Sequence, residues 1–187
     1  MDIINFEEID STNSYAKANL KNLNDMTVLS TDLQTAGHGQ FNRYWHSSNK
    51  NGGNCYITII LKPKNKEHVG KITSFASLII GKTLEKYGLE PKFKYPNDVM
   101  ISGKKIAGIL AEATSHGEEL IGIALGMGIN LNLEKEELET IDQPATSIFN
   151  ETGRVVDKIE FIKYLLDNFK REYTNLIEYG IGGKIYE

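Results

Sequence analysis

Two adjacent motifs constrain the fold of this chain more than any other part of its sequence. The first is Lys-Tyr-Pro-Asn-Asp at 94–98, and the second is Lys-Lys-Ile-Ala-Gly-Ile-Leu-Ala-Glu at 104–112. A Pro-Asn-Asp cluster cannot continue a helix or a central strand, so it predicts a turn that presents an amide and a carboxylate. Ser102-Gly103 predicts a tight hairpin turn, after which the second motif continues as an aliphatic strand. The hairpin therefore returns Lys105 to the side of this amide and carboxylate, around a site of nucleotide size.

The length and composition are those of one ordinary domain. The chain has 187 residues, of which 40% are hydrophobic, which is enough for a substantial core. Its net charge is −4 without any long run of like charge, so we expect no DNA and no anionic membrane among its partners. No apolar run approaches a membrane span, and the acidic N-terminus is unlike a secretion signal. The single cysteine, Cys55, fits a reducing compartment, so we expect a cytoplasmic protein.

The apolar patterning predicts an α+β fold in which helices pack against a mixed β-sheet. Apolar residues recur at helical spacing over 67–87 and 159–179, and a shorter helix should begin at Ser11 or Thr12. Strands are predicted at 3–6, 27–31, 54–61, 105–110 and 120–131. A polar loop at 34–53 separates the second of these strands from the third, and loops of this length are usually functional or disordered.

The long loop begins with a candidate anion-binding segment, Gln-Thr-Ala-Gly-His-Gly-Gln-Phe-Asn-Arg-Tyr-Trp at 34–45. Gly37 and Gly39 would allow backbone N–H groups to face an anion, Arg43 supplies a permanent charge, and Trp45 supplies an apolar anchor. Glycine-rich surface loops are common, so these residues alone favour an ordinary loop over a phosphate-binding one.

Taken together, the motifs resemble those of biotin protein ligases. The resemblance rests on residues 94–112, supported by the glycine-rich loop, Ser-Thr-Asn at 11–13, the Gly-Met-Gly-Ile-Asn segment ending at Asn130, and Ala-Thr-Ser-Ile at 145–148. These matches follow the family's order. The resemblance implies a catalytic domain over 1–187 with a fold like that of class II aminoacyl-tRNA synthetases. It also implies that the family's N-terminal DNA-binding domain is missing and that its C-terminal β-barrel domain is absent or truncated.

The resemblance further implies an activity. Biotin would be activated by ATP, with Mg²⁺, to biotinyl-5′-AMP, and biotin would then be transferred to a lysine of a biotin carboxyl carrier protein. Neither step needs an enzyme nucleophile, so catalysis should come from positioning and from neutralising phosphate charge. Lys105 and Arg43 are the catalytic residues implied. A strand-edge homodimer is also known in the family, although the oligomeric state cannot be inferred from this sequence.

Carried over residue by residue, the resemblance implies two overlapping sets of binding residues. The biotin-binding set consists of Ser11, Thr12, Asn13, Gln34, Gly37, His38, Gly39, Gln40, Lys105, Gly108 and Leu110. The ATP-binding set consists of Arg43, Trp45, Asn97, Asp98, Lys105 and Asn130, and Asp98 is also the candidate Mg²⁺ ligand. Without the resemblance, Ser11 to Asn13 would be an ordinary helix N-cap and Asn130 part of a buried strand.

The loop departs from the family pattern, which reads Gly-Arg-Gly-Arg-Arg-Gly-Arg. Here the first three arginines are replaced by His38, Gln40 and Phe41, while Arg43 and Trp45 match. The chain has three arginines and eighteen lysines, but a drift from arginine to lysine would have kept the charge. We therefore expect the activated intermediate to be held less tightly than by the full arginine set.

Two other functions remain open. The first is a lipoate or octanoate ligase, which shares the superfold and also modifies a carrier lysine. The second is a non-catalytic biotin or nucleotide binder, which would fit a loop that has lost most of its arginines. Metal and nucleophile chemistry is disfavoured, because the four histidines lack the spacing of a zinc site and Cys55 lies within a predicted strand.

Overall fold

The computed structural model describes residues 1–179 except 49, 51, 65 and 68. The strands are β1 (Ile3–Ile9), β2 (Val28–Gln34), β3 (Asn54–Leu61), β4 (Lys92–Lys94), β5 (Asp98–Ile101), β6 (Lys104–His116) and β7 (Glu119–Asn130). The α-helices are α1 (Thr12–Asn19), α2 (Ile72–Glu85), α3 (Lys135–Leu138), α4 (Ile148–Thr152) and α5 (Lys158–Tyr179), and 3₁₀ turns lie at Gln40–Asn42 and Val69–Lys71.

The strands of the described chain form one mixed sheet, in the order β1-β2-β3-β7-β6-β5-β4. β1 and β2 are parallel, and the other neighbours are antiparallel. The α+β prediction is thus confirmed, and all five predicted strands are present. The strand expected to end at residue 110 extends to His116, because it continues beside β7 in one long hairpin. The sequence analysis did not predict β4, a three-residue edge strand with two lysines.

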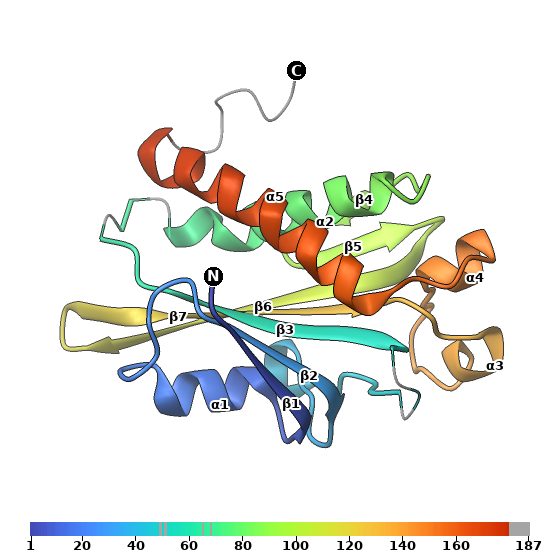
Figure 1. Ribbon diagram of the computed structural model, residues 1–187, viewed down its shortest axis with the longest axis horizontal. Coiled ribbons are helices and arrows are strands. Elements are labelled where there is room, and N and C mark those ends of the chain that lie inside the picture. Colours follow the sequence, from blue (N-terminus) through green and yellow to red (C-terminus); the bar gives the residue numbers. More distant parts are fainter. Residues whose placement is uncertain (49, 51, 65, 68, 180–187) are drawn as a thin grey trace.

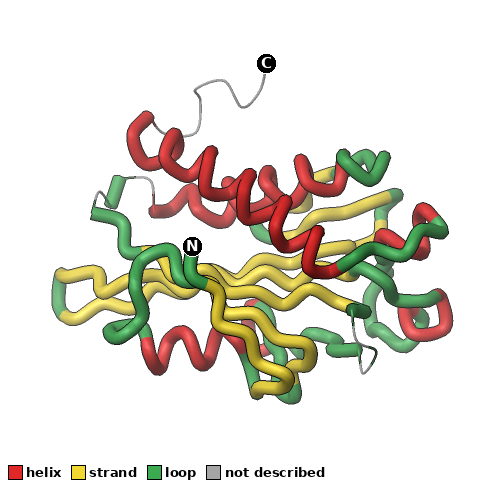
Figure 2. The backbone as a smooth tube through the Cα atoms, viewed as in Figure 1, coloured by secondary structure: helices red, strands yellow, loops and turns green. Residues whose placement is uncertain are grey.

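Helices cover both faces of the sheet. Figures 1 and 2 show α2 and α5 on one face and α1 on the other. Alternation along β3 matches this arrangement, because Ile57 and Ile59 belong to the core beneath α2 and α5, whereas Ile60 belongs to the smaller cluster beneath α1. The sheet is therefore covered over much of both faces. Polar strand residues nevertheless face α1, where they form part of the site described below.

The two long predicted helices are present. The helix predicted at 67–87 is observed as the 3₁₀ turn at Val69–Lys71 followed by α2, and Gly88 follows it with a positive φ of 78°. His68, which lies in the predicted range, is outside the described residues. At the start of α5, the Asp157 side chain accepts a hydrogen bond from the Glu160 N–H at 2.9 Å. None of the described helices is long and apolar enough to cross a membrane.

The aromatic contacts between α2 and α5 lead to a prediction about stability. Phe75 is fully buried, and its ring lies 5.2 Å from that of Phe169 and 6.2 Å from that of Tyr173. Phe75→Ala should lower the free energy of unfolding by about 3–5 kcal/mol, because it leaves a cavity in the core. Urea denaturation measures this loss. Phe41→Ala makes the same change at a ring that is 89% exposed and should cost far less; equal losses would contradict the packing described here.

Candidate active site

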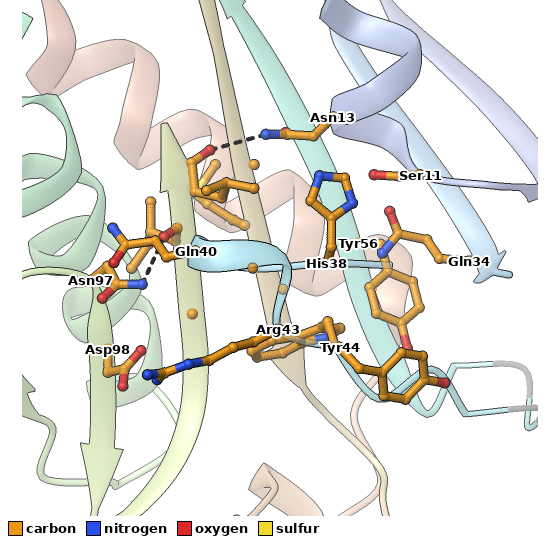
Figure 3. A pocket seen from close by; sticks show the side chains of 18 of the residues that line it. Ser11, Asn13, Gln34, His38, Gln40, Arg43, Tyr44, Tyr56, Asn97 and Asp98 are labelled. Carbon is orange, nitrogen blue, oxygen red and sulfur yellow. Dashed lines mark hydrogen bonds between the residues drawn. The ribbon is translucent and has the colours of Figure 1, made fainter. Parts of the chain in front are cut away.

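A pocket lies on the α1 face of the sheet, where the loop after β2 crosses β3, β7 and β6 (Figure 3). Its volume is about 140 Å³. The structure brings the predicted site residues together here, with two exceptions, since neither Gly37 nor Asn130 lines this pocket. We call it the main pocket.

The floor of the main pocket consists of cross-strand rows of side chains. Directly opposed residues on antiparallel strands face the same side, so the register defines each row. The first row is Thr58, Gly126 and Leu110; the middle row is Tyr56, Gly128 and Gly108; the third row includes Asn54 and Asn130. Glycine occupies three of the positions in the first two rows, which leaves a hollow where side chains would otherwise stand.

Each of these glycines makes room for a specific side chain. A Cβ added to Gly126 would overlap Asn13. A Cβ at Gly128 or Gly108 would lie 2.6 or 2.7 Å from the indole of Trp45. The floor therefore accommodates Asn13 over the first row and Trp45 over the middle row.

A buried polar network surrounds the first row. Ser11 caps α1 by accepting from the Ser14 N–H, which confirms the N-cap interpretation. The Thr12 N–H and hydroxyl both donate to Gln34 Oε1, at 2.9 and 3.1 Å. Asn13 Oδ1 accepts from the Thr58 hydroxyl at 2.8 Å, and its Nδ2 donates to the Leu110 carbonyl at 3.2 Å. These bonds fix the direction of several polar groups at the α1 end of the pocket.

Glu112 supports Asn13 from the rim. Asn13 Nδ2 donates to Glu112 Oε2 at 3.0 Å, and Lys17 Nζ lies 2.7 Å from Oε1. Partial burial acts to raise the pKa of Glu112, but the hydrogen bonds from Lys17 and Asn13 outweigh it and leave the pKa below its usual range. Glu112 is therefore ionised at neutral pH and anchors Asn13 through charge-assisted contact.

The predicted anion loop is a compact hairpin. His38 and Tyr44 form an antiparallel bridge, the Trp45 N–H donates to the Gly37 carbonyl at 3.0 Å, and the Gly39 N–H donates to the Arg43 carbonyl at 2.8 Å. The Gly39 N–H is thus used inside the hairpin in this structure, and anion binding by the other N–H groups of the loop stays a prediction. His38 extends between Asn13 and Gln34, as Figure 3 shows.

Lys105 lies in the wall of the main pocket with its charge paired. Its Nζ is 2.7 Å from Asp98 Oδ1 and 5.2 Å from the centre of the Trp45 ring, and its side chain is 14% exposed. Asn97 is fixed beside them, because its Nδ2 donates to the Ile109 carbonyl at 3.2 Å. Arg43 also extends toward Asp98 (Figure 3). The predicted convergence of the amide, the carboxylate and the cation is thus observed.

Asn130 lies apart from this group. Its Oδ1 accepts from Asn54 at 2.9 Å and its Nδ2 donates to the Thr146 carbonyl at 2.9 Å, so its amide supports the fold here. It lines a second, smaller cavity of about 30 Å³, the side pocket, whose other residues are Tyr44, Trp45, His46, Lys105, Ile141, Gln143 and Ala145. The predicted ATP-binding residues are therefore divided between two cavities.

The sequence analysis did not assign Tyr56, Thr58, Gly126, Gly128 or Gln143 to the site. A usable signal was present in β3, where Asn54, Tyr56 and Thr58 alternate with apolar residues and so share one face. Gly126 and Gly128 have the same spacing of two. No local pattern marks Gln143, which reaches the site because Lys105 forms a parallel bridge with Ala145.

Two predictions about reactive residues can also be compared with the structure. In the described chain, no three His, Cys, Asp or Glu side chains are grouped so as to hold a metal ion. Cys55 is fully buried, and burial raises its pKa to about 12, so its thiol stays protonated. The prediction that Cys55 is a core residue is confirmed.

The fold matches that of solved biotin protein ligases. The biotin protein ligase of Aquifex aeolicus, solved in complex with biotin and ATP, superposes with a TM-score of 0.81 at 29% identity, over 95% of this chain and 72% of that one. The family model described as "Biotin/lipoate A/B protein ligase family" matches residues 5–130, more than half of the chain. The chain belongs to this family.

The relatives of this chain include proteins named as ligases and proteins named as bifunctional ligase/repressors. The biotin--[acetyl-CoA-carboxylase] ligase of Paracoccus denitrificans is 31% identical over 91% of this chain and 72% of that protein. The bifunctional ligase/repressor BirA of Bacillus spizizenii is 28% identical over 94% of this chain but only 55% of that protein. The chain thus spans about half the length of the bifunctional relative.

The contacts of Glu112 predict a pH dependence of stability. Because its pKa is lowered by folding, Glu112 stabilises the folded state above its ordinary pKa, and this contribution is lost as the pH falls through the lowered value. Glu112→Gln should destabilise the protein near neutral pH, by about 1 kcal/mol or less, and the difference from wild type should vanish in acid. Urea denaturation at several pH values measures it. Glu136→Gln, an exposed change on α3, is the control; an unchanged Glu112 difference in acid would contradict the linkage.

Proposed function

We propose that this chain catalyses ATP-dependent attachment of biotin to a protein. Biotin would be converted to biotinyl-5′-AMP and then transferred to a specific lysine of a biotin carboxyl carrier protein. The observation that carries the proposal is Lys105, a paired cation in the wall of a pocket that has buried polar groups at one end and Asn97 and Asp98 at the other. The Aquifex structure with biotin and ATP, and the relatives named as biotin ligases, support the same function.

The α1 end of the main pocket suits a cyclic urea. A ureido group both accepts and donates hydrogen bonds, so it needs donors and acceptors in fixed directions. Gln34 Oε1 is occupied by Thr12, which directs the Gln34 amide N–H groups elsewhere, and Ser11 contributes a buried hydroxyl. We propose that biotin's ring binds here and that its carboxylate end points toward Lys105.

Lys105 would act at the junction of the two substrates. In the first step, a biotin carboxylate oxygen forms a bond to the α-phosphorus of ATP, and the bond from that phosphorus to pyrophosphate breaks. In the second, the carrier lysine amine attacks the acyl carbon, AMP leaves, and the amine loses a proton. Lys105 would hold the carboxylate against the phosphate and neutralise the charge that develops on its oxygens, with Arg43 as the second cation.

Asp98 is the protein group proposed to face Mg²⁺. Magnesium commonly binds through one or two carboxylates together with substrate phosphates, so a single Asp98 suffices when ATP brings the ion. Asp98 is ion-paired with Lys105, which places a carboxylate oxygen beside the cation that would meet the α-phosphate. The ion would offset the charge of the triphosphate, while Asn97 contacts the nucleotide.

The proposal also covers the oligomeric state and the location of the enzyme. β5 pairs with β6 only as far as Gly108, and in the described chain β6 has no neighbouring strand on that side from Leu110 onward. We propose this edge for a homodimer, which light scattering of the purified protein would detect. A cytoplasmic location, where ATP and the carrier are available, completes the proposal.

One assay separates the proposal from its alternatives. The protein is incubated with ATP, labelled biotin and an apo biotin carboxyl carrier, and then with lipoate in place of biotin. Labelled carrier with biotin alone supports the ligase proposed here. If the carrier is modified only with lipoate, the chain is a lipoate ligase. If biotin or ATP binds but no carrier is modified, the chain is a non-catalytic binder.

The position of Lys105 gives the most direct mutational prediction. Lys105→Ala should reduce biotin-dependent exchange of pyrophosphate into ATP by at least about a hundredfold, because preorganised charge stabilisation is commonly worth that much. Lys104→Ala is the matched control, since Lys104 is the exposed neighbour on the same strand and faces the other way. Near-normal exchange by Lys105→Ala, with circular dichroism showing both variants folded, would remove Lys105 from this role.

The loss of arginines from the loop at 34–45 predicts weak retention of biotinyl-5′-AMP. Gln40 lines the main pocket in place of an arginine, and Arg43 is the loop's remaining guanidinium. Gln40→Arg should slow the release of biotinyl-5′-AMP about tenfold or more, since one charge-assisted contact is worth roughly 1.5–3 kcal/mol. Rapid dilution of the preformed complex measures the rate, and Gln40→Leu is the uncharged control. Equal release rates in all three proteins would contradict the prediction.

A further inference from the structure

The backbone of Lys105 is held by residues 144–146, which we call the bridge segment. β7 pairs with β6 from Ala107 onward, so it does not reach Lys105. The bridge segment takes its place and forms a parallel bridge with Lys105. The Lys105 N–H donates to the Pro144 carbonyl at 2.9 Å, and the Lys105 carbonyl accepts from the Thr146 N–H at 2.9 Å. The position of Lys105 therefore depends on this segment.

The bridge segment also orients Asn130. The Thr146 carbonyl accepts from Asn130 Nδ2 at 2.9 Å, and Asn54 Nδ2 donates to Asn130 Oδ1 at 2.9 Å. A side-chain amide has two donors and two acceptor lone pairs, so these contacts leave one N–H and one lone pair of Asn130 for a ligand in the side pocket. Through its N–H and its carbonyl, Thr146 thus joins Lys105 to Asn130.

The side chain of Thr146 is held from outside the site. Thr146 is fully buried, and its hydroxyl donates to Glu151 Oε1 at 2.5 Å and accepts from Asn150 Nδ2 at 3.1 Å. Both partners belong to α4, which lies at one end of the sheet (Figure 1). In the described chain, no residue of α4 lines the main pocket or the side pocket. Ser147 caps this helix by accepting from the Asn150 N–H at 3.0 Å, so α4 is itself fixed.

We propose that Thr146 is a positioning residue and that Glu151 holds it in place. The contact between the hydroxyl and Glu151 sets the bridge segment, and the bridge segment sets Lys105 and Asn130 together. A displacement of about 1 Å in a catalytic group can cost about a hundredfold in rate, so a support outside the pocket affects activity. This inference rests on the proposed function, because Lys105 and Asn130 are assigned to ATP there.

The polar network at the α1 end of the main pocket does not share this support. The Thr12 N–H and hydroxyl donate to Gln34, and Asn13 bonds to Thr58 and to the Leu110 carbonyl. None of these contacts involves the bridge segment. Loss of the Thr146 hydroxyl should therefore impair the use of ATP far more than the binding of biotin, whereas a general loss of structure would impair both.

The kinetics of biotin-dependent pyrophosphate exchange test the proposal. Thr146→Val keeps the shape of the side chain and removes the hydroxyl, and the freed Glu151 and Asn150 can reach water because neither is buried. We expect kcat/KM for ATP to fall about tenfold or more, since a hydrogen bond to a charged group is commonly worth that much. Biotin affinity, measured by calorimetry without ATP, should stay close to that of the wild type. Thr146→Ser keeps the hydroxyl and should restore most of the activity.

Variants of α4 supply the control and a second test. Thr152→Val makes the same change on α4, where the hydroxyl donates to the Ile148 carbonyl at 2.8 Å, and it should leave kcat/KM for ATP unchanged. Glu151→Ala should reproduce the loss caused by Thr146→Val. Glu151→Gln keeps an oxygen acceptor for the hydroxyl and should recover part of the activity.

The outcomes separate positioning from stability and from the proposed reaction. Urea denaturation shows which variants are folded, and if Thr146→Val does not fold, the two Glu151 variants decide in the same way. Unchanged kcat/KM for ATP in the folded variants, or an equal loss of biotin affinity, would overturn the positioning role and leave the ligase proposal intact. Absence of exchange by the wild-type protein would overturn the ligase proposal, and the positioning role with it.

Discussion

The pairing of β3, β7 and β6 in one register is the constraint on which the rest of the site depends. Side chains alternate along β7, so Gly126 and Gly128 can face the pocket only while Met127 and Ile129 face the core beneath α2 and α5. A slip of one residue would expose the buried pair and turn the glycines into the core. The packing on the far face of the sheet therefore fixes the geometry of the near face, and the hollow in the floor is a consequence of a well-packed core.

Electrostatic pairing explains how a lysine can be kept in the wall of that hollow. Placing an ammonium group where its side chain is only 14% exposed is costly unless an anion accompanies it, and Asp98 supplies that anion at 2.7 Å. The two residues come from adjacent antiparallel strands, β5 and β6, so the short hairpin that joins them also sets their distance. A substrate carboxylate and phosphate would enter a site whose cation is already oriented, which is the preorganisation that charge-stabilising catalysis requires.

The sequence allowed the sheet, the long helices and the convergence of Lys105 with Asn97 and Asp98 to be predicted, because these depend on strong local patterns and one short hairpin. It did not allow the partners of Asn130 to be predicted, since they come from β3 and from the segment before α4. The same holds for the Gly39 N–H, whose acceptor depends on how the loop folds back. β4 was missed because Lys-Phe-Lys is too short and too polar to read as a strand, although Phe93 packs against Gly81 of α2.

The loop combines two features that have one physical explanation. In a loop with several arginines, the like charges repel one another until an anion binds between them. Here most of that charge is absent, and the resting contact is an indole on glycine backbone, which needs no anion to form. Apolar contact of this kind is also insensitive to salt, unlike the attraction between exposed charges. The contact of Trp45 with the glycine floor therefore forms without an anion, and the loop has less charge with which to hold one.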